Sequence, residues 1–279
     1  MLDPYTSREL LALYNQKKIS AFALELLPRI SRAQSMDVLS SQSNLAGYRA
    51  VIDAVAIFGK AVPMMMTAAG TVAPAKVLVL GAGVAGLQAI ATAKRLGAVV
   101  SAFDVRGAAK EQVESLGAKF IEVPAEESGD AAGGYAKEMS EDYKRKQSQL
   151  IADTIKKQDV VISTALIPGK PAPVLITEAM VKDMKAGSVI VDLAVASGGN
   201  CPLSELDKVV VKHGVTLIGY SNMPSRVAVD ASQLYARNVY NFVSTLLISK
   251  EGLSVKWDDE LVIGTLLTKE GATVHKAFA

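Results

Sequence analysis

Three observations predict that this chain of 279 residues folds as an α/β protein with a doubly wound parallel sheet. Half of the residues are hydrophobic but only 5% are aromatic, a composition that suits close packing of helices on a sheet. Short apolar runs alternate with helical segments along most of the sequence, which is typical of parallel strands joined by right-handed crossovers. One of these runs leads directly into a glycine-rich turn.

The composition also excludes several classes of protein. The net charge of +2 gives no sign of a nucleic-acid partner. A single cysteine, Cys201, rules out an internal disulfide framework and fits a reducing compartment. The start of the chain has no apolar core of a signal peptide, and glycines break the apolar run 77–93 where a turn is needed. We therefore expect contact with a membrane only through a partner.

The glycine-rich turn is the most informative stretch. The apolar run Lys76–Leu80 predicts a buried parallel strand, and Gly81, Gly83 and Gly86 follow it with G-x-G-x-x-G spacing. In such a turn the first glycine permits a sharp bend, the second leaves room for a pyrophosphate, and the third lets the next helix pack closely. The helix, predicted over 87–97, directs free N–H groups and its positive dipole end at the phosphates.

An acidic residue follows at the spacing that a dinucleotide site requires. A second apolar strand, 98–104, ends in Asp104, 18 residues after Gly86, where its carboxylate can accept hydrogen bonds from an adenosine ribose. Asp104 favours NAD(H), because a 2′-phosphate would lie against its charge, although Arg106 could soften that preference. The arrangement is that of a Rossmann fold; the alternative is a tight strand–helix turn without a ligand.

Before the turn, the chain predicts a helix over 3–18, a strand over 19–27, a polar loop over 29–37 and a long helix over 41–61. Met64, Met65 and Met66 are expected to fill a core, because methionine is apolar and unbranched.

After Asp104, the expected elements are strands over 119–123, 159–166, 188–195 and 215–220, and helices over 136–157, 179–185 and 225–248, with a strand-like run at 261–263. Together with the first two, these strands give a sheet of six. Ligands bind beyond the carboxyl ends of such strands, where Thr164, Ala165 and Leu166 lie. The loop 124–135 is long enough to be functional, with a floppy insertion as the alternative.

The two long helices flank the nucleotide-binding stretch, so we expect two lobes joined by paired helices. The predicted division is a remnant of the first lobe at 1–38, a dinucleotide-binding domain with its connecting helix at 39–226, and a return helix and tail at 227–279. The second α/β lobe is thus incomplete and built from both chain ends.

Few residues have the pattern of acid–base or metal chemistry. His213, expected at a helix end, and His275 are interpreted as surface or capping residues, and Cys201 as a small buried side chain. Neither metal-ligand spacing nor a Ser-His-Asp order is present. The loop 29–37 is more suggestive, because its arginine, glutamine and aspartate can together hydrogen-bond a carboxamide; a solvated loop is the alternative.

Several strings are highly specific. RAQSMDVLSSQSNLAGYR at 32–49, MMMTAAGT at 64–71 and NMPSR at 222–226 resemble the NAD(H)-binding alpha subunits of proton-translocating NAD(P) transhydrogenases. GGYAKEM at 133–139 is also similar, although Ala132 stands where that family often has a third glycine.

The resemblance implies that NADH passes a hydride to NADP⁺ on a separate NADP(H)-binding component, coupled to proton passage by a membrane component. It implies a homodimer, cytoplasmic or on the mitochondrial matrix side, peripheral to the inner membrane through its partners. Four residues would act near the nicotinamide: Arg29, Gln34, Asp37 and Ser40. The cofactor-binding set would be Gly81, Gly83, Val84, Ala85, Gly86, Asp104, Val105, Arg106, Tyr135, Thr164, Ala165 and Leu166, with Tyr135 on a closing loop.

The resemblance further implies that on the order of a hundred residues, most of an ordinary domain, would precede this sequence. Two alternatives remain open at this point. One is an NAD-dependent oxidoreductase of the alanine dehydrogenase type, and the other is a non-catalytic NAD-binding fragment.

Overall fold

The computed structural model describes residues 1–124, 139–167 and 169–279, which form two compact units. Unit 1 comprises Met1–Gln42 and Ala228–Ala279, so both chain ends contribute to it, and unit 2 comprises Ser43–Val227. The domain boundaries at 38/39 and 226/227 stay a prediction, because compactness alone does not define a folding domain.

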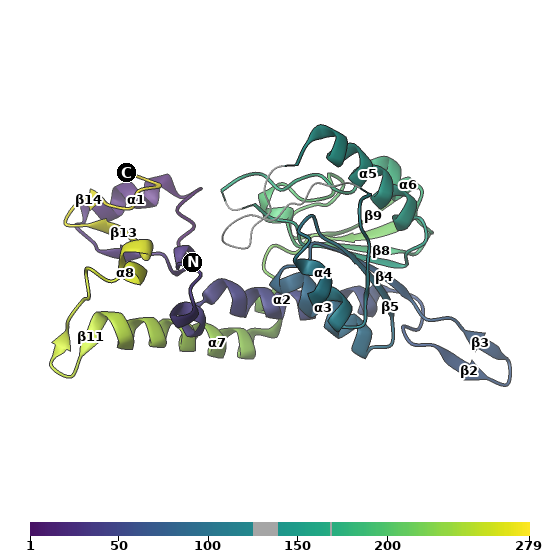
Figure 1. The fold of residues 1–279 in the computed structure, drawn as a ribbon, viewed down its shortest axis with the longest axis horizontal. Coiled ribbons are helices and arrows are strands. Elements are labelled where there is room, and N and C mark those ends of the chain that lie inside the picture. Colours follow the sequence, from purple (N-terminus) through teal and green to yellow (C-terminus); the bar gives the residue numbers. More distant parts are fainter. Residues whose placement is uncertain (125–138, 168) are drawn as a thin grey trace. The chain divides into compact units, whose positions relative to one another are not determined.

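The sheet of unit 2 confirms the predicted doubly wound architecture (Figure 1). Its strand order is β6-β5-β4-β7-β8-β10-β9, and all neighbours are parallel except the pair β9 and β10. The chain builds outward from β4 in one direction and then returns to the other side of β4, so a topological switch point lies between β4 and β7. The strands are β4 (Lys76–Leu80), β5 (Val99–Phe103), β6 (Lys119–Phe120), β7 (Val160–Ser163), β8 (Val189–Asp192), β9 (Val209–Lys212) and β10 (Val215–Ile218).

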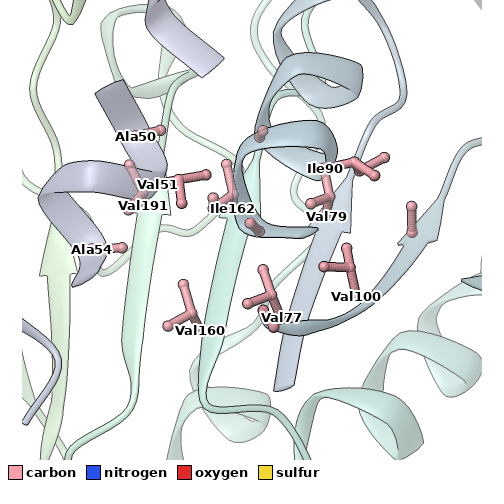
Figure 2. Close-up of a cluster of buried hydrophobic side chains, with 14 of the residues drawn as sticks. Ala50, Val51, Ala54, Val77, Val79, Ile90, Val100, Val160, Ile162 and Val191 are labelled. Atoms are coloured by element: carbon pink, nitrogen blue, oxygen red, sulfur yellow. The ribbon is translucent and has the colours of Figure 1, made fainter. Parts of the chain in front are cut away.

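Alternating side chains of the central strands enter two apolar layers. Val77 and Val79 of β4 pack with α2 and α3 on one face (Figure 2), whereas Leu78 and Leu80 pack with α5 and α6 on the other. Each fully buried aliphatic side chain stabilises the fold by about 1.5–3 kcal/mol. The helices are α2 (Val38–Ile57), α3 (Val84–Arg95), α4 (Ala109–Ser115), α5 (Glu141–Ile155) and α6 (Glu178–Lys182).

The three methionines do not fill a core, so that expectation was wrong. Met64 precedes, and Met65 and Met66 belong to, a hairpin of β2 (Met65–Thr67) and β3 (Gly70–Val72), which projects from the sheet in Figure 1. Every residue of the two strands is exposed, and Met66 retains 79% of its accessible surface. Gly70, with φ of +134°, takes the backbone shape that this tight turn needs.

Unit 1 has a three-stranded sheet of order β1-β13-β14, packed with short helices. The strand expected over 19–27 is reduced to β1 (Ala21–Phe22), followed by a 3₁₀ turn (Leu24–Leu26). The helix expected over 225–248 is divided into α7 (Ala228–Phe242) and a π-helical turn (Val243–Leu247). The remaining elements are α1 (Arg8–Gln16), β11 (Ile248–Ser249), β12 (Gly252–Leu253), α8 (Glu260–Thr265), β13 (Leu266–Lys269) and β14 (Ala272–Thr273).

Three further expectations need correction. The strand-like run 261–263 lies in α8, because the side chain of Asp259 caps the helix by accepting from Leu261 N–H at 2.9 Å. The polar loop 29–37 contains a 3₁₀ helix, Ser31–Met36, which buries Ala33 and Met36. His213 lies on the surface as expected, but in the β9–β10 turn with φ of +52° rather than at a helix end.

No helix in the described part of the chain is long and apolar enough to cross a membrane.

Candidate functional site

In the glycine turn of unit 2, Gly81 and Gly86 are required by close packing, whereas Gly83 has open space beside it. Gly81 follows β4 with φ of +98°, and a Cβ there would lie 2.6 Å from Thr164 Oγ1. A Cβ on Gly86 would overlap the carbonyl oxygen of Gly81. A Cβ on Gly83 would meet no atom of the described residues within 4 Å. Gly83 therefore borders open space from which a ligand can approach the backbone.

The first turn of α3 has the character of an anion site. Gly83 is its N-cap residue and offers no side-chain cap to the N–H groups of Val84 and Ala85. Gly47 of α2 packs so closely behind the turn that a Cβ on it would overlap the carbonyl oxygen of Ala85. The turn is thus backed by a helix on one side and open at Gly83 on the other.

Asp104, at the end of β5, is tied to the glycine turn. Its carboxylate accepts a hydrogen bond from Ala82 N–H at 2.7 Å, and it accepts from Arg106 Nε and Nη2, each at 2.8 Å. Its side chain is 7% exposed. Arg106 is therefore held in place by Asp104. A ribose hydroxyl that binds Asp104 would share its carboxylate with the Arg106 guanidinium. Val105, between them, packs partly against the apolar layer of α5.

The end of β7 adjoins the same turn. Thr164 Oγ1 donates to the carbonyl oxygen of Gly81 at 3.0 Å, and Thr164 N–H donates to Leu80 O at 2.8 Å. Ala165 follows at this edge, and Leu166 is about half exposed. The structure therefore brings Gly81, Asp104 and Thr164 together at the switch point between β4 and β7.

One residue at this edge was not singled out from the sequence. Asn200 is fully buried, and its carboxamide bonds to the backbone of Ala165. The only signal for it is an asparagine directly after two glycines at the end of a strand segment.

Unit 1 holds a pocket of about 330 Å³, within the range of small-molecule sites. All four residues predicted to act near the nicotinamide line it. The lining residues are Pro28, Arg29, Ile30, Ser31, Ala33, Gln34, Asp37 and Ser40. Asp37 accepts from both Ser40 N–H, at 2.9 Å, and Ser40 Oγ, at 2.6 Å, so it caps the start of α2. The pocket therefore combines a guanidinium, a carboxamide and a fixed carboxylate.

Cys201 is unsuited to nucleophilic catalysis. Cys201 is buried, and this burial raises the pKa of its thiol, which disfavours the nucleophilic thiolate. Among the described residues, no group of three or more His, Cys, Asp or Glu side chains could hold a metal ion. Tyr135 lies outside the described residues.

Comparison with known proteins decides the family. The family model described as alanine dehydrogenase/PNT, C-terminal domain, matches residues 50–276, and the corresponding N-terminal domain matches residues 1–46. An NAD(P) transhydrogenase subunit alpha of Rhodospirillum rubrum is 62% identical over 99% of this chain and 73% of that protein. This chain belongs to the family of NAD(P) transhydrogenase alpha subunits.

A solved structure agrees with this assignment. The transhydrogenase from Sinorhizobium meliloti is 52% identical to this transhydrogenase-family chain, with a TM-score of 0.83 over 99% of this chain and 72% of that one. The alanine dehydrogenase of Bacillus subtilis is 28% identical over 97% of this chain and 68% of that protein. The alanine dehydrogenase alternative is therefore the less supported of the two.

Proposed function

We propose that this transhydrogenase-family chain binds NAD(H) at the glycine turn and passes a hydride between NADH and NADP⁺ held by a partner component. The observation that carries the proposal is the turn Gly81–Gly86 at the switch point, with open backbone at Gly83 and with Asp104 tied to Ala82. The nicotinamide supplies the hydride, and this chain supplies binding and orientation.

The glycine turn and the strand ends would hold the adenosine and pyrophosphate. Backbone N–H groups of Gly83, Val84 and Ala85, at the positive end of α3, would bind the phosphates. Asp104 accepts from the ribose hydroxyls, and its charge opposes a 2′-phosphate. Val105 and Arg106 follow it in the same segment, and Gly86 keeps α3 close to β4. Thr164, Ala165 and Leu166, which follow β7, are proposed to line the side of the nucleotide site across from Asp104.

The unit 1 pocket would serve the nicotinamide, a role that the family resemblance assigns to its residues. A carboxamide both donates and accepts hydrogen bonds, which Arg29, Gln34, Asp37 and Ser40 can match. Hydride transfer between two nicotinamides needs close positioning rather than an acid or a base. The scarcity of acid–base candidates in the chain fits that requirement. Tyr135 is proposed, from the resemblance alone, to close over the nucleotide.

The family resemblance also supports a proposal for the proteins with which this chain assembles. We propose a homodimer that docks to an NADP(H)-binding component and to a membrane component that translocates protons. The chain would thus act in the cytoplasm, or in the matrix of a mitochondrion, peripheral to the inner membrane. The exposed Met64, Met65 and Met66 support the homodimer, since a second copy would cover their apolar surface.

A parallel titration with NADH and NADPH, followed by nucleotide fluorescence, tests the proposal. We expect tight binding of NADH and weak binding of NADPH, and then transfer once the NADP(H)-binding component is added. Oxidation of NADH that depends on pyruvate and ammonia would instead favour an alanine dehydrogenase. Binding of NADH without transfer to any acceptor would favour a non-catalytic NAD-binding protein.

A further inference from the structure

Asn200 uses its whole side chain to hold the carboxyl end of β7 and the segment that follows it. Its Oδ1 accepts from Ser163 Oγ and from Ala165 N–H, at 2.5 and 3.1 Å. Its Nδ2 donates to the carbonyl oxygens of Ala165 and Pro173, at 2.9 and 2.8 Å. The residue is 0% exposed, so none of these bonds competes with water.

The two glycines before Asn200 have the backbone conformation that places its side chain at β7. Gly198 and Gly199 have φ of +98° and +82°, and a Cβ on Gly199 would lie 2.8 Å from Asp192 Oδ2. The buried carboxylate of Asp192 then accepts from Asn200 N–H at 3.2 Å and from Cys201 N–H at 3.0 Å. The carboxyl end of β8 therefore fixes the backbone of Asn200, and Asn200 in turn fixes the segment after β7.

The contacts continue to the nucleotide site. Asn200 hydrogen-bonds both the N–H and the carbonyl of Ala165. The residue before Ala165, Thr164, donates its hydroxyl to Gly81 O. A Cβ on Gly81 would lie 3.4 Å from Ala165 N, so the gripped peptide directly borders the glycine turn. The next residue is the half-exposed Leu166.

We infer that Asn200 is a positioning residue for the nucleotide site. It fixes the peptide of Ala165, and with it Thr164 and Leu166, before NADH arrives. Only a carboxamide can accept from a hydroxyl and an N–H and also donate to two carbonyls at this point. The inference rests on the proposed function, because it concerns the same NADH site.

The variant Asn200→Asp tests the inference. It has nearly the same shape, but the carboxylate would face the carbonyl oxygens of Ala165 and Pro173 without a donor. We expect the NADH dissociation constant, measured by fluorescence, to rise roughly tenfold or more. With the NADP(H)-binding component present, kcat at saturating NADH should stay within about twofold while KM rises, because the reacting groups are untouched.

Val181→Ala is the matched control. Val181 is fully buried in α6, so its truncation lowers stability while leaving the hydrogen bonds of Asn200 in place. Its NADH dissociation constant should stay within about twofold of the wild-type value. An equal rise in both variants, or an unchanged constant in Asn200→Asp, would overturn the inference while leaving NADH binding by the wild-type chain intact. A wild-type chain that binds no NADH would overturn the proposed function itself.

Hydrogen exchange on the wild-type chain provides a second measurement if Asn200→Asp does not fold. The Ala165 amide should exchange slowly without nucleotide, because Asn200 already holds it. Free exchange of this amide, followed by strong protection on adding NADH, would show that the nucleotide rather than Asn200 orders the segment.

Discussion

At the scale of single residues, Asp104 has two tasks at once. It joins β5 to the glycine turn through Ala82 N–H, and it binds the guanidinium of Arg106 with both carboxylate oxygens. A charged acceptor that is 7% exposed interacts strongly with each of its donors. The negative charge that favours a ribose hydroxyl is thus also the charge that keeps Arg106 in place.

Replacing Asp104 with Asn should weaken NADH binding by roughly 1–3 kcal/mol, because ribose hydroxyls lose a charged acceptor. The ratio of NADPH to NADH affinity should rise, since the charge that opposes a 2′-phosphate is gone and Arg106 loses its carboxylate partner. Parallel fluorescence titrations measure both quantities. Asp207→Asn, a surface carboxylate bonded to Ser221, is the control. Unchanged NADH affinity in Asp104→Asn would remove Asp104 from the site.

Gln34→Ala should slow hydride transfer more than it weakens NADH binding, because a carboxamide contact aligns the nicotinamide ring. Stopped-flow transfer with the NADP(H)-binding component, beside a binding titration, separates the two effects. Arg32→Ala is a control on the same 3₁₀ helix, since Arg32 pairs with Asp259 and Glu260 and does not line the pocket. Equal losses of transfer and binding would argue against a positioning role for Gln34.

The sequence led to these residues by different routes. Asp104 follows from local spacing, because the βαβ unit fixes where its acidic residue falls. Ser40 came from the family resemblance, whereas chemistry suggested a carboxamide site at the arginine, glutamine and aspartate of 29–37 and left a solvated loop as the alternative. The pocket forms because Ala33 and Met36 are buried against residues such as Phe242, far along the chain. Asn200 was missed because its partners are set by three separate segments.

At the scale of elements, local signals decided which predictions were confirmed. The strand before Gly81 was predicted to the residue, since glycine spacing and an apolar run act within a short stretch, whereas α3 spans Val84–Arg95 rather than the predicted 87–97. The run 261–263 was misassigned because three apolar residues fit a helix or a strand equally well. Strand β9 was missed, and as the antiparallel edge strand it lies outside the alternation that predicted the other strands.

Asp159 links two elements of the sheet and makes its stability depend on pH. Burial by itself would raise the pKa of Asp159, but hydrogen bonds from Lys185 Nζ and from Lys76 N–H outweigh it and lower the pKa. A carboxylate whose pKa is lowered on folding stabilises the protein above its unfolded pKa of about 3.9. That contribution is lost as the pH falls through the lower, folded pKa.

Asp159→Asn should therefore lower the free energy of unfolding at pH 7 by about 1–3 kcal/mol and flatten its decline below about pH 4. Urea unfolding at a series of pH values measures both effects. Asp153→Asn is the control, because Asp153 is exposed and lies 3.8 Å from Lys156. The same acid dependence in wild-type and Asp159→Asn proteins would contradict the assignment.

At the scale of the whole molecule, the chain passes between its two units twice, after Gln42 and after Val227. Within unit 2, the second passage is anchored to α2, because Arg226 Nε donates to the buried Asp53 at 2.7 Å and Arg49 shares that carboxylate. The hydrogen bond to Asp53 raises the pKa of Arg226, so the guanidinium keeps its charge. Two flanking helices were enough to predict two units, but no local pattern reveals a bond between residues so far apart in sequence.

Assembly into a dimer also belongs to the scale of the whole molecule, and the exposed β2–β3 hairpin is the feature that bears on it. A hairpin of two strands is marginally stable in water unless something packs on it, and β2–β3 exposes all its residues, Met66 by 79%. In a two-fold symmetric dimer, each copy would cover this surface on the other. Light scattering should then give twice the chain mass of 29.4 kDa.

Met66→Asp should return the mass to 29.4 kDa, because symmetry places two charges in one apolar contact. Val211→Asp is the matched control: it puts the same charge on an equally apolar, 66% exposed residue, but on the edge strand β9. It should leave the dimer intact, and neither variant should lose NADH binding, since neither residue adjoins the glycine turn. A wild-type mass of 29.4 kDa would remove the homodimer from the proposal. If the Met66→Asp variant stays dimeric, the homodimer stands but its contact lies away from the hairpin. The partner components would then be left to cover the hairpin.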